Sequence, residues 1–100
     1  DKVEVHNNLK KLDSADVVIT DTWESMGEAV NEKIIRDFSS YTVNQKMMSI
    51  FGNECIFMHC LPANRGQEVA PEVIDGPQSV VWDEAQNRLH IQKEIIKWCL

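Results

Sequence analysis

The sequence predicts an α/β domain, a Rossmann-like three-layer unit with about four parallel strands joined by crossover helices. Three observations predict this fold class. Short apolar, β-branched runs alternate with segments whose apolar residues recur at helical spacing. Chemically reactive polar residues follow directly after several of the expected strands. No internal repeat or linker interrupts the 100 residues, so one domain accounts for the whole chain.

In the first half of the chain, β-branched residues predict two strands and helical spacing predicts three helices. These elements are a strand at 3–5, a brief helix at 9–12 capped by Asn7 or Asn8, a strand at 17–20, a helix at 31–38 and a helix at 43–51. The last helix is expected to take its cap from Thr42, to end at Gly52 and to turn Val43, Met47 and Ile50 inward.

In the second half, an apolar strand at 55–58 stops before Pro62, because proline cannot donate to a sheet ladder. A loop at 63–67 leads to a short helix from Pro71 to Ile74, with proline at its first position. A last strand at 79–82 and a helix from Glu84 to about Trp98, capped by Asp83, complete the fold. The expected inner face of that helix consists of Ala85, Leu89, Lys93, Ile96 and Leu100.

The composition restricts the class of protein. The chain is 43% hydrophobic and 26% charged, which is ordinary for a soluble domain. Its formal net charge of -6 argues against unspecific nucleic-acid binding, which needs a basic face. No apolar run approaches the ~18 residues of a membrane span. The first residues do not resemble a signal peptide.

The three cysteines, Cys55, Cys60 and Cys99, form no C-x-x-C pair, so we expect reduced thiols in a cytosol-like compartment. A metal site built from His59, Cys60 and His90 lacks recognisable ligand spacing, and no metal is predicted. The four glycines are not spaced as G-x-G-x-x-G, which excludes a dinucleotide-binding turn.

Reactive residues gather at three predicted strand ends, and parallel strands bring such ends to one edge of a sheet, where ligands bind. The three groups are residues 21–26, residues 59–62 and the start of the last helix with Arg88. Asp21 either binds an amine or caps its loop. Cys60 is a nucleophile, a proton acceptor or an inert buried thiol, and only a nearby cation, such as His59 or Arg88, or a helix N-terminus would activate it.

Arg88 is suited to a phosphate or carboxylate, or else it is a solvated surface arginine. The Leu61-Pro62 bond is of separate interest because X-Pro bonds are cis in only ~5–6% of folded cases. A cis bond here would aim the Cys60 and Leu61 carbonyls into the crevice. Composition and spacing leave these alternatives open.

Three motifs together resemble the ornithine carbamoyltransferase family, in that family's order and spacing and over nearly the whole chain. They are Asp21-Thr22-Trp23-Glu24-Ser25-Met26-Gly27, then His59-Cys60-Leu61-Pro62 followed by Arg65-Gly66-x-Glu68-Val69, then Glu84-Ala85-x-Asn87-Arg88. The resemblance implies that residues 1–100 are the C-terminal part of the ornithine-binding domain of a larger two-domain enzyme. The carbamoyl phosphate-binding domain would be absent from this chain, which begins without methionine.

The resemblance also implies an activity. Members of the family transfer a carbamoyl group from carbamoyl phosphate to the δ-amine of L-ornithine, giving citrulline and phosphate, in arginine biosynthesis or the urea cycle. No metal or organic cofactor takes part. The expected assembly is a homotrimer or a multiple of trimers, with no nucleic-acid or membrane partner, in the cytoplasm or, in a eukaryote, the mitochondrial matrix.

Residue roles follow from the resemblance position by position. Asp21, Ser25 and Met26 match ornithine-binding positions, and Cys60 matches the proton acceptor. Cys60, Leu61 and Arg88 match carbamoyl phosphate contacts, His59 and Pro62 support them, and the Leu61-Pro62 bond is expected to be cis. Asn64 departs from the histidine common in bacterial members.

Two rival functions belong to the same fold. One is a carbamoyltransferase for putrescine or another amine, against which the S-M-G loop argues. The other is a non-catalytic module, which would be expected to have lost Asp21, Cys60 or Arg88. The S-T-R-T and H-P-x-Q motifs of the family are missing, so the isolated chain is expected to be inactive.

Overall fold

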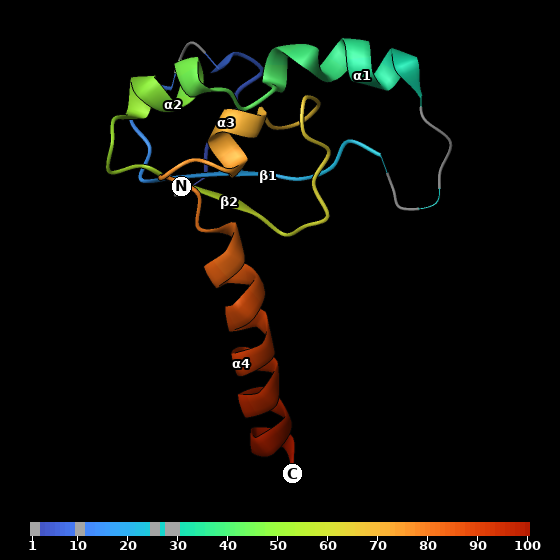
Figure 1. Cartoon of the computed structure of the whole chain (residues 1–100), viewed down its shortest axis with the longest axis vertical. Coiled ribbons are helices and arrows are strands. Elements are labelled where there is room, and N and C mark those ends of the chain that lie inside the picture. Colours follow the sequence, from blue (N-terminus) through green and yellow to red (C-terminus); the bar gives the residue numbers. More distant parts are fainter. Residues whose placement is uncertain (1–2, 10–11, 25–26, 28–30) are drawn as a thin grey trace.

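The computed structural model of the chain describes residues 3–9, 12–24, 27 and 31–100. Its elements in order are β1 (Val17–Thr20), α1 (Glu32–Phe38), the 3-10 turn η2 (Ser39–Tyr41), α2 (Gln45–Phe51), β2 (Ile56–His59), α3 (Pro71–Ile74) and α4 (Val81–Cys99). Helices α1, α2 and α3 lie on one side of the two strands, whereas α4 leaves on the other side and projects away (Figure 1).

The two strands form a parallel pair whose register runs from Val17 opposite Ile56 to Thr20 opposite His59. Parallel pairing needs a long crossover connection, and α1 and α2 lie within it. The α/β class with a parallel sheet is therefore confirmed. The register ends both strands at the same edge, so Asp21 and Cys60 leave the sheet side by side.

The expected count of about four strands is wrong for the described residues, which form a two-stranded sheet. Residues 3–5 are not in a strand. The expected strand at 79–82 is reduced to one bridge between Phe57 and Ser79. The Val80 N–H donates to the Phe57 carbonyl at 3.0 Å, and the Val80 carbonyl then accepts from the Glu84 N–H at 2.9 Å, which turns the chain into α4.

Consequently α4 begins at Val81, three residues before the predicted Glu84, and Asp83 lies in its first turn instead of capping it. The start of α2 also differs from the prediction. Asn44, not Thr42, caps this helix through the Met47 N–H, and the Thr42 hydroxyl donates to the Gln67 carbonyl instead.

Two other helix ends are capped: the cap at Asn31 is not among the predictions, whereas the end at Gly52 agrees with them. The Asn31 side chain accepts from the N–H groups of Lys33 and Ile34 at the start of α1. Gly52 has a φ of 87°, the left-handed region that favours glycine, and it ends α2. Leu12 donates to the Leu9 carbonyl as in a helical turn, but residues 10–11 of the expected brief helix lie outside the described residues.

The core lies between β2 and the helices α2 and α3. Its buried members are Val43, Met48, Cys55, Phe57, Val69, Val73, Ile74 and Val81. The predicted inner stripe of α2 is correct for Val43 and wrong for Ile50, which is 58% exposed. Residue 43 is held outside the helix by backbone hydrogen bonds to Glu68 and Ala70, so the buried face of α2 moves to Met48.

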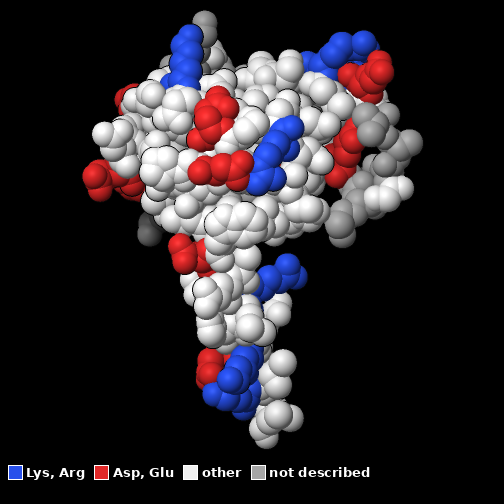
Figure 2. Space-filling view, in the orientation of Figure 1, with Lys and Arg blue, Asp and Glu red and all other residues white. Residues whose placement is uncertain are grey.

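The predicted inner face of α4 is not covered in the described chain. Only Val81 is buried in this helix, and Leu89 is 67% exposed. Beyond its first turn the helix extends away from the rest of the chain, where its surface combines charged groups of both signs with uncharged side chains (Figure 2). Among the described helices, none is both long and apolar enough to cross a membrane.

Candidate functional site

The two predicted loops meet at the carboxyl ends of β1 and β2. Because Thr20 lies opposite His59, the next residue of each chain segment, Asp21 and Cys60, is the first beyond the sheet. The Cys60 Sγ donates a hydrogen bond to Asp21 Oδ1 at 3.2 Å. A thiol and a carboxylate that lie 39 positions apart in the sequence are thus in direct contact.

Asp21 is exposed, and its Oδ1 also accepts from the Thr22 N–H at 2.7 Å. The hydrogen bond from Cys60 lowers the pKa of Asp21, and the Thr22 N–H lowers it further. Asp21 is therefore a carboxylate at neutral pH. The bond from Thr22 agrees with the loop-capping interpretation, and the same oxygen also faces the Cys60 thiol.

Cys60 is exposed, so the alternative of an inert buried thiol does not describe it. Its pKa is raised, first by the hydrogen bond to Asp21, then by desolvation and by the negative charge of that carboxylate. The described residues consequently hold Cys60 as a neutral thiol. Cys55 is the buried thiol of the chain, and desolvation raises its pKa.

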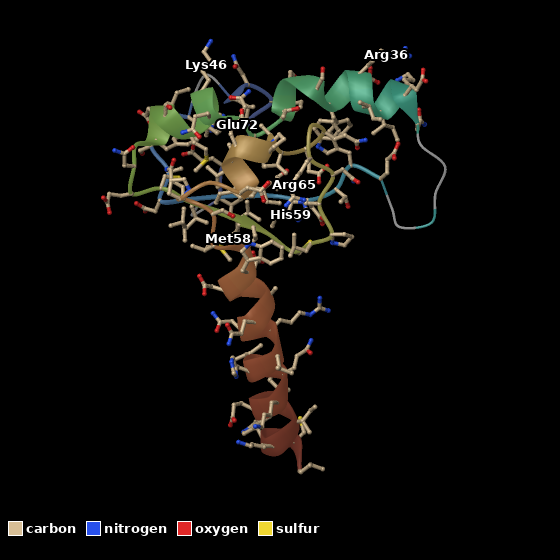
Figure 3. All side chains as sticks on the ribbon, viewed as in Figure 1. Arg36, Lys46, Met58, His59, Arg65 and Glu72 are labelled. Carbon is tan, nitrogen blue, oxygen red and sulfur yellow. The ribbon has the colours of Figure 1, made fainter. Side chains whose placement is uncertain are left out.

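His59 is fully buried at the C-terminal end of β2 (Figure 3). Its Nδ1 accepts from the Leu61 N–H at 2.9 Å, and its Nε2 lies 3.2 Å from Glu68 Oε1. Because an N–H points at Nδ1, the ring proton is on Nε2 and is donated to the glutamate. The His59 N–H donates to Glu84 Oε2 at 3.0 Å, which ties β2 to α4.

Leu61 has a φ of 56°, in the left-handed region that non-glycine residues rarely adopt. Such a conformation costs about 1–3 kcal/mol and persists where the surroundings hold it. Here the hydrogen bond from Leu61 to the His59 ring does so. The Leu61-Pro62 bond is cis, as the family resemblance implied.

A cleft of about 550 Å³ opens beside this loop. Its lining consists of Cys60, Glu84, Ala85, Asn87, Arg88 and Ile91. The third predicted group, at the start of α4, therefore reaches the same place as the thiol. Arg88 has no carboxylate partner in the part of the chain that the structure describes, so its guanidinium is available to an anion.

The other residues considered from the sequence are not among those that line this cleft in the described chain. Ser25 and Met26 lie outside the described residues. His90 is exposed on α4. Pro62 directly follows the left-handed Leu61. Sequence reasoning assigned no role to Glu68, although it belongs to one of the quoted motifs, and a fully buried glutamate is rare.

Three potential metal-ligand atoms, from Asp21, His59 and Cys60, lie within 4.8 Å of one another. Hydrogen bonds account for all three side chains. Both ring nitrogens of His59 are engaged, and the thiol of Cys60 is bound to Asp21. A cation would have to break these bonds, so we assign no metal to this cluster.

A parallel α/β unit with a cleft at the carboxyl ends of its strands, lined by a thiol and an arginine, belongs to the class of small-molecule-binding α/β domains. Residues 1–99 match the family described as aspartate/ornithine carbamoyltransferase, Asp/Orn binding domain. The chain belongs to this family.

Relatives with known names agree with this assignment. The chain is 60% identical over 86 residues to an ornithine carbamoyltransferase of Rhodopseudomonas palustris, covering 86% of this chain and 28% of that protein. It is 52% identical over 99 residues to one of Wolinella succinogenes, covering 97% of this chain and 32% of that protein.

The structure of ornithine carbamoyltransferase from Pyrococcus furiosus superimposes with a TM-score of 0.81 at 47% identity, covering 92% of this chain and 30% of that one. The chain thus spans about a third of the length of the relatives it matches.

Proposed function

We propose that the protein carrying this chain transfers a carbamoyl group from carbamoyl phosphate to the δ-amine of L-ornithine, giving citrulline and phosphate. The observation that carries this proposal is the contact between Cys60 and Asp21 beside the cleft that Arg88 lines. These residues stand in the motifs that resemble the family, in a chain 52–60% identical to proteins named ornithine carbamoyltransferase.

The proposal extends to the organisation of the whole protein. Residues 1–100 would form the C-terminal part of the ornithine-binding domain, and a separate segment would supply the carbamoyl phosphate-binding domain. We further expect the whole protein to be a homotrimer and to act in arginine biosynthesis. Its expected compartment is the cytoplasm or the mitochondrial matrix. The support for these points is the family membership and the one-third coverage of the relatives.

Asp21 and Cys60 would act on the incoming amine. The δ-ammonium of ornithine must lose a proton before its nitrogen attacks the carbamoyl carbon. The Asp21 carboxylate attracts this cation, and the cation in turn lowers the pKa of the neighbouring Cys60 thiol. Cys60 then gives up its own proton to solvent and accepts one from the ammonium. Ser25 and Met26 would hold the rest of ornithine, as their motif positions imply.

Arg88 would act on the carbamoyl group. As the N–C bond forms, the carbonyl oxygen gains negative charge, and a guanidinium facing the cleft stabilises it. The carbonyls of Cys60 and Leu61 would accept hydrogen bonds from the carbamoyl NH₂ group. The C–O bond to phosphate then breaks, and phosphate leaves with the electron pair and takes the second proton of the attacking nitrogen, so no covalent enzyme intermediate is needed.

A different acceptor amine is the competing function. The chain is also similar to an N-acetyl-L-ornithine transcarbamylase structure, at 35% identity and a TM-score of 0.72. The higher identity to proteins named ornithine carbamoyltransferase favours unmodified ornithine.

The test uses the product of the complete reading frame that contains these residues, called here the parent enzyme. Carbamoyl transfer is measured with ornithine, N-acetyl-L-ornithine and putrescine at equal concentrations. We expect the highest kcat/KM with ornithine and no turnover by the isolated 100-residue chain. Preference for another amine would contradict the proposed substrate, and turnover by the isolated chain would contradict the proposed domain organisation.

A further inference from the structure

Behind the loop of Cys60 lies a buried pair, His59 and Glu68, each 0% exposed. Among the described residues these are the fully buried polar or charged side chains. Burying a carboxylate is costly unless hydrogen bonds compensate for the lost water. Apolar residues would fill the same space in the core without this cost. The buried pair therefore needs an explanation other than core packing.

The pair connects the body of the domain to the backbone amide that directly follows Cys60. Glu68 Oε1 accepts from the Asn64 N–H at 2.6 Å and faces His59 Nε2 at 3.2 Å. On the other side of the ring, His59 Nδ1 accepts from the Leu61 N–H at 2.9 Å. The imidazole therefore spans the space between the glutamate and the left-handed turn at Leu61.

Glu68 itself is fixed by the backbone around it. Its carbonyl accepts from the Val43 N–H at 2.9 Å, and the next residue but one, Ala70, donates to the Val43 carbonyl at 2.8 Å. These bonds attach the segment to the start of α2. The anchor is thus attached to the body of the domain at α2 as well as to the loop at Asn64.

The turn needs such a hold because Leu61 has a φ of 56°. Cys60 lies between the ring that accepts the hydrogen bond and the residue that donates it. If the acceptor at Nδ1 were lost, the turn would relax, and the Cys60 Sγ would leave Asp21 Oδ1.

We propose that His59 and Glu68 are positioning residues that set the direction of the Cys60 thiol and carbonyl through the Leu61 N–H. We call His59 and Glu68 the dyad. Its effect on catalysis rests on the proposed carbamoyl transfer, but its effect on the position of the Cys60 thiol does not. Neither residue touches the cleft that Arg88 lines.

Two substitutions of His59 separate positioning from simple packing. In His59→Asn the side-chain oxygen stands near the place of Nδ1 and still accepts from the Leu61 N–H. In His59→Gln the amide reaches toward Glu68 but leaves the Leu61 N–H without an acceptor. Both variants remove the ring, so they lose similar packing.

Steady-state kinetics of the parent enzyme is the first measurement. We expect His59→Gln to lose about 100-fold in kcat, as misplacement of a reacting group does, with a smaller change in the KM for ornithine. His59→Asn should recover most of that loss. Equal losses in both variants at equal Tm would overturn the proposal, because a packing role does not distinguish them.

The second measurement does not depend on turnover. Alkylation of Cys60 by iodoacetamide is followed by peptide mapping, with exposed Cys99 on α4 as the internal reference. Release of the thiol from Asp21 should speed alkylation of Cys60 severalfold in His59→Gln and leave it unchanged in His59→Asn. An unchanged rate in both variants would refute the dyad. If the rates separate but the wild type makes no citrulline, the dyad stands and the proposed function fails.

Discussion

The chemistry of Cys60 is decided by one neighbour. Both Cys55 and Cys60 have a raised pKa, but the causes differ: desolvation comes first for Cys55, and the hydrogen bond to Asp21 comes first for Cys60. If Cys60 became a thiolate, its negative charge would face the Asp21 carboxylate, and the hydrogen bond from its S–H group to that carboxylate would be lost. The activating cations expected from the sequence, His59 and Arg88, do not offset this effect.

Asp21→Asn should therefore lower the pKa of Cys60, because the neutral amide removes the negative charge and offers an N–H to a thiolate. The rate of Cys60 alkylation in the isolated chain should begin to rise at lower pH than in the wild type. In the parent enzyme the KM for ornithine should increase, since the carboxylate proposed to attract the amine is gone.

Asp13→Asn is the matched control, because Asp13 is an exposed acid outside the site. It should leave the alkylation profile of Cys60 unchanged. A profile in Asp21→Asn that matches the wild type would contradict the assignment of Asp21 as the group that holds the thiol proton.

Arg88 and Arg65 differ in their surroundings. Arg65 forms a bidentate pair with Asp75, whereas Arg88 lines the cleft beside Cys60 without a carboxylate partner in the described chain. A planar guanidinium can give two parallel hydrogen bonds to an oxyanion, and an ammonium cannot.

Arg88→Lys should consequently raise the KM for carbamoyl phosphate by about 10-fold or more in the parent enzyme, although the charge is kept. Arg36→Lys on the exposed end of α1 provides the comparison and should have no effect on either KM. Equal KM values for carbamoyl phosphate in Arg88→Lys and wild type would show that the guanidinium does not bind this substrate.

At the scale of elements, an ion pair joins the loop after the Cys60 turn to the end of α3. Arg65 Nε and Nη2 donate to the two oxygens of Asp75 at 2.9 and 2.7 Å. The hydrogen bond with Arg65 lowers the pKa of Asp75 below its ordinary 3.8. Both side chains are solvent-exposed, so the pair contributes modestly to stability.

The pH dependence of this contribution has a definite sign. Since the pKa of Asp75 is lower in the folded state, its stabilisation is present above the ordinary pKa of 3.8 and is lost as the pH falls through the lowered value. Asp75→Asn should therefore have a lower Tm than the wild type at neutral pH, with the difference closing in acid. Glu54→Gln, at an exposed turn, should show no such convergence, and a difference independent of pH would contradict the ion-pair explanation.

Several features of the elements could be predicted from the sequence, and others could not. Val17–Thr20 and the Pro71–Ile74 helix agree with their apolar and proline signals, and the strand ends converge as parallel pairing requires. The start of α2 depends on hydrogen bonds between Val43 and residues 68–70, which no local pattern reveals. The buried partner of His59 was missed for the same reason, because Glu68 meets the ring only through the folded loop.

At the scale of the whole molecule, stability is distributed unevenly. The core residues belong to β2, α2, α3 and their flanking segments, and α4 contributes only Val81 to it. Periodicity predicts an apolar stripe on α4, but it does not say what covers that stripe. In the described chain, Leu89 and Ile96 of the expected inner face are exposed, and the helix projects from the domain (Figure 1).

This distribution predicts the pattern of amide hydrogen exchange in the isolated chain. Amides of β2 and α3, surrounded by buried side chains, should exchange only through larger openings of the domain. Amides from Leu89 to Cys99 depend on helix hydrogen bonds alone, and a helix without tertiary packing is marginally stable in water. They should therefore exchange much faster than those of β2, whereas amides from Glu84 to Arg88, whose helix hydrogen bonds begin at the Val80 carbonyl beside the core, should be intermediate.

Exchange is measured by mass spectrometry at several protein concentrations. Protection of the far half of α4 that equals that of β2, and does not change with concentration, would contradict the arrangement in which α4 is held only at its first turn. Protection that rises with concentration would instead leave the fold intact and indicate that copies of the chain cover the helix. In the parent enzyme, the same peptides report whether the part of the protein outside these 100 residues packs on Leu89 and Ile96. Such packing would slow the exchange of the α4 amides relative to the isolated chain.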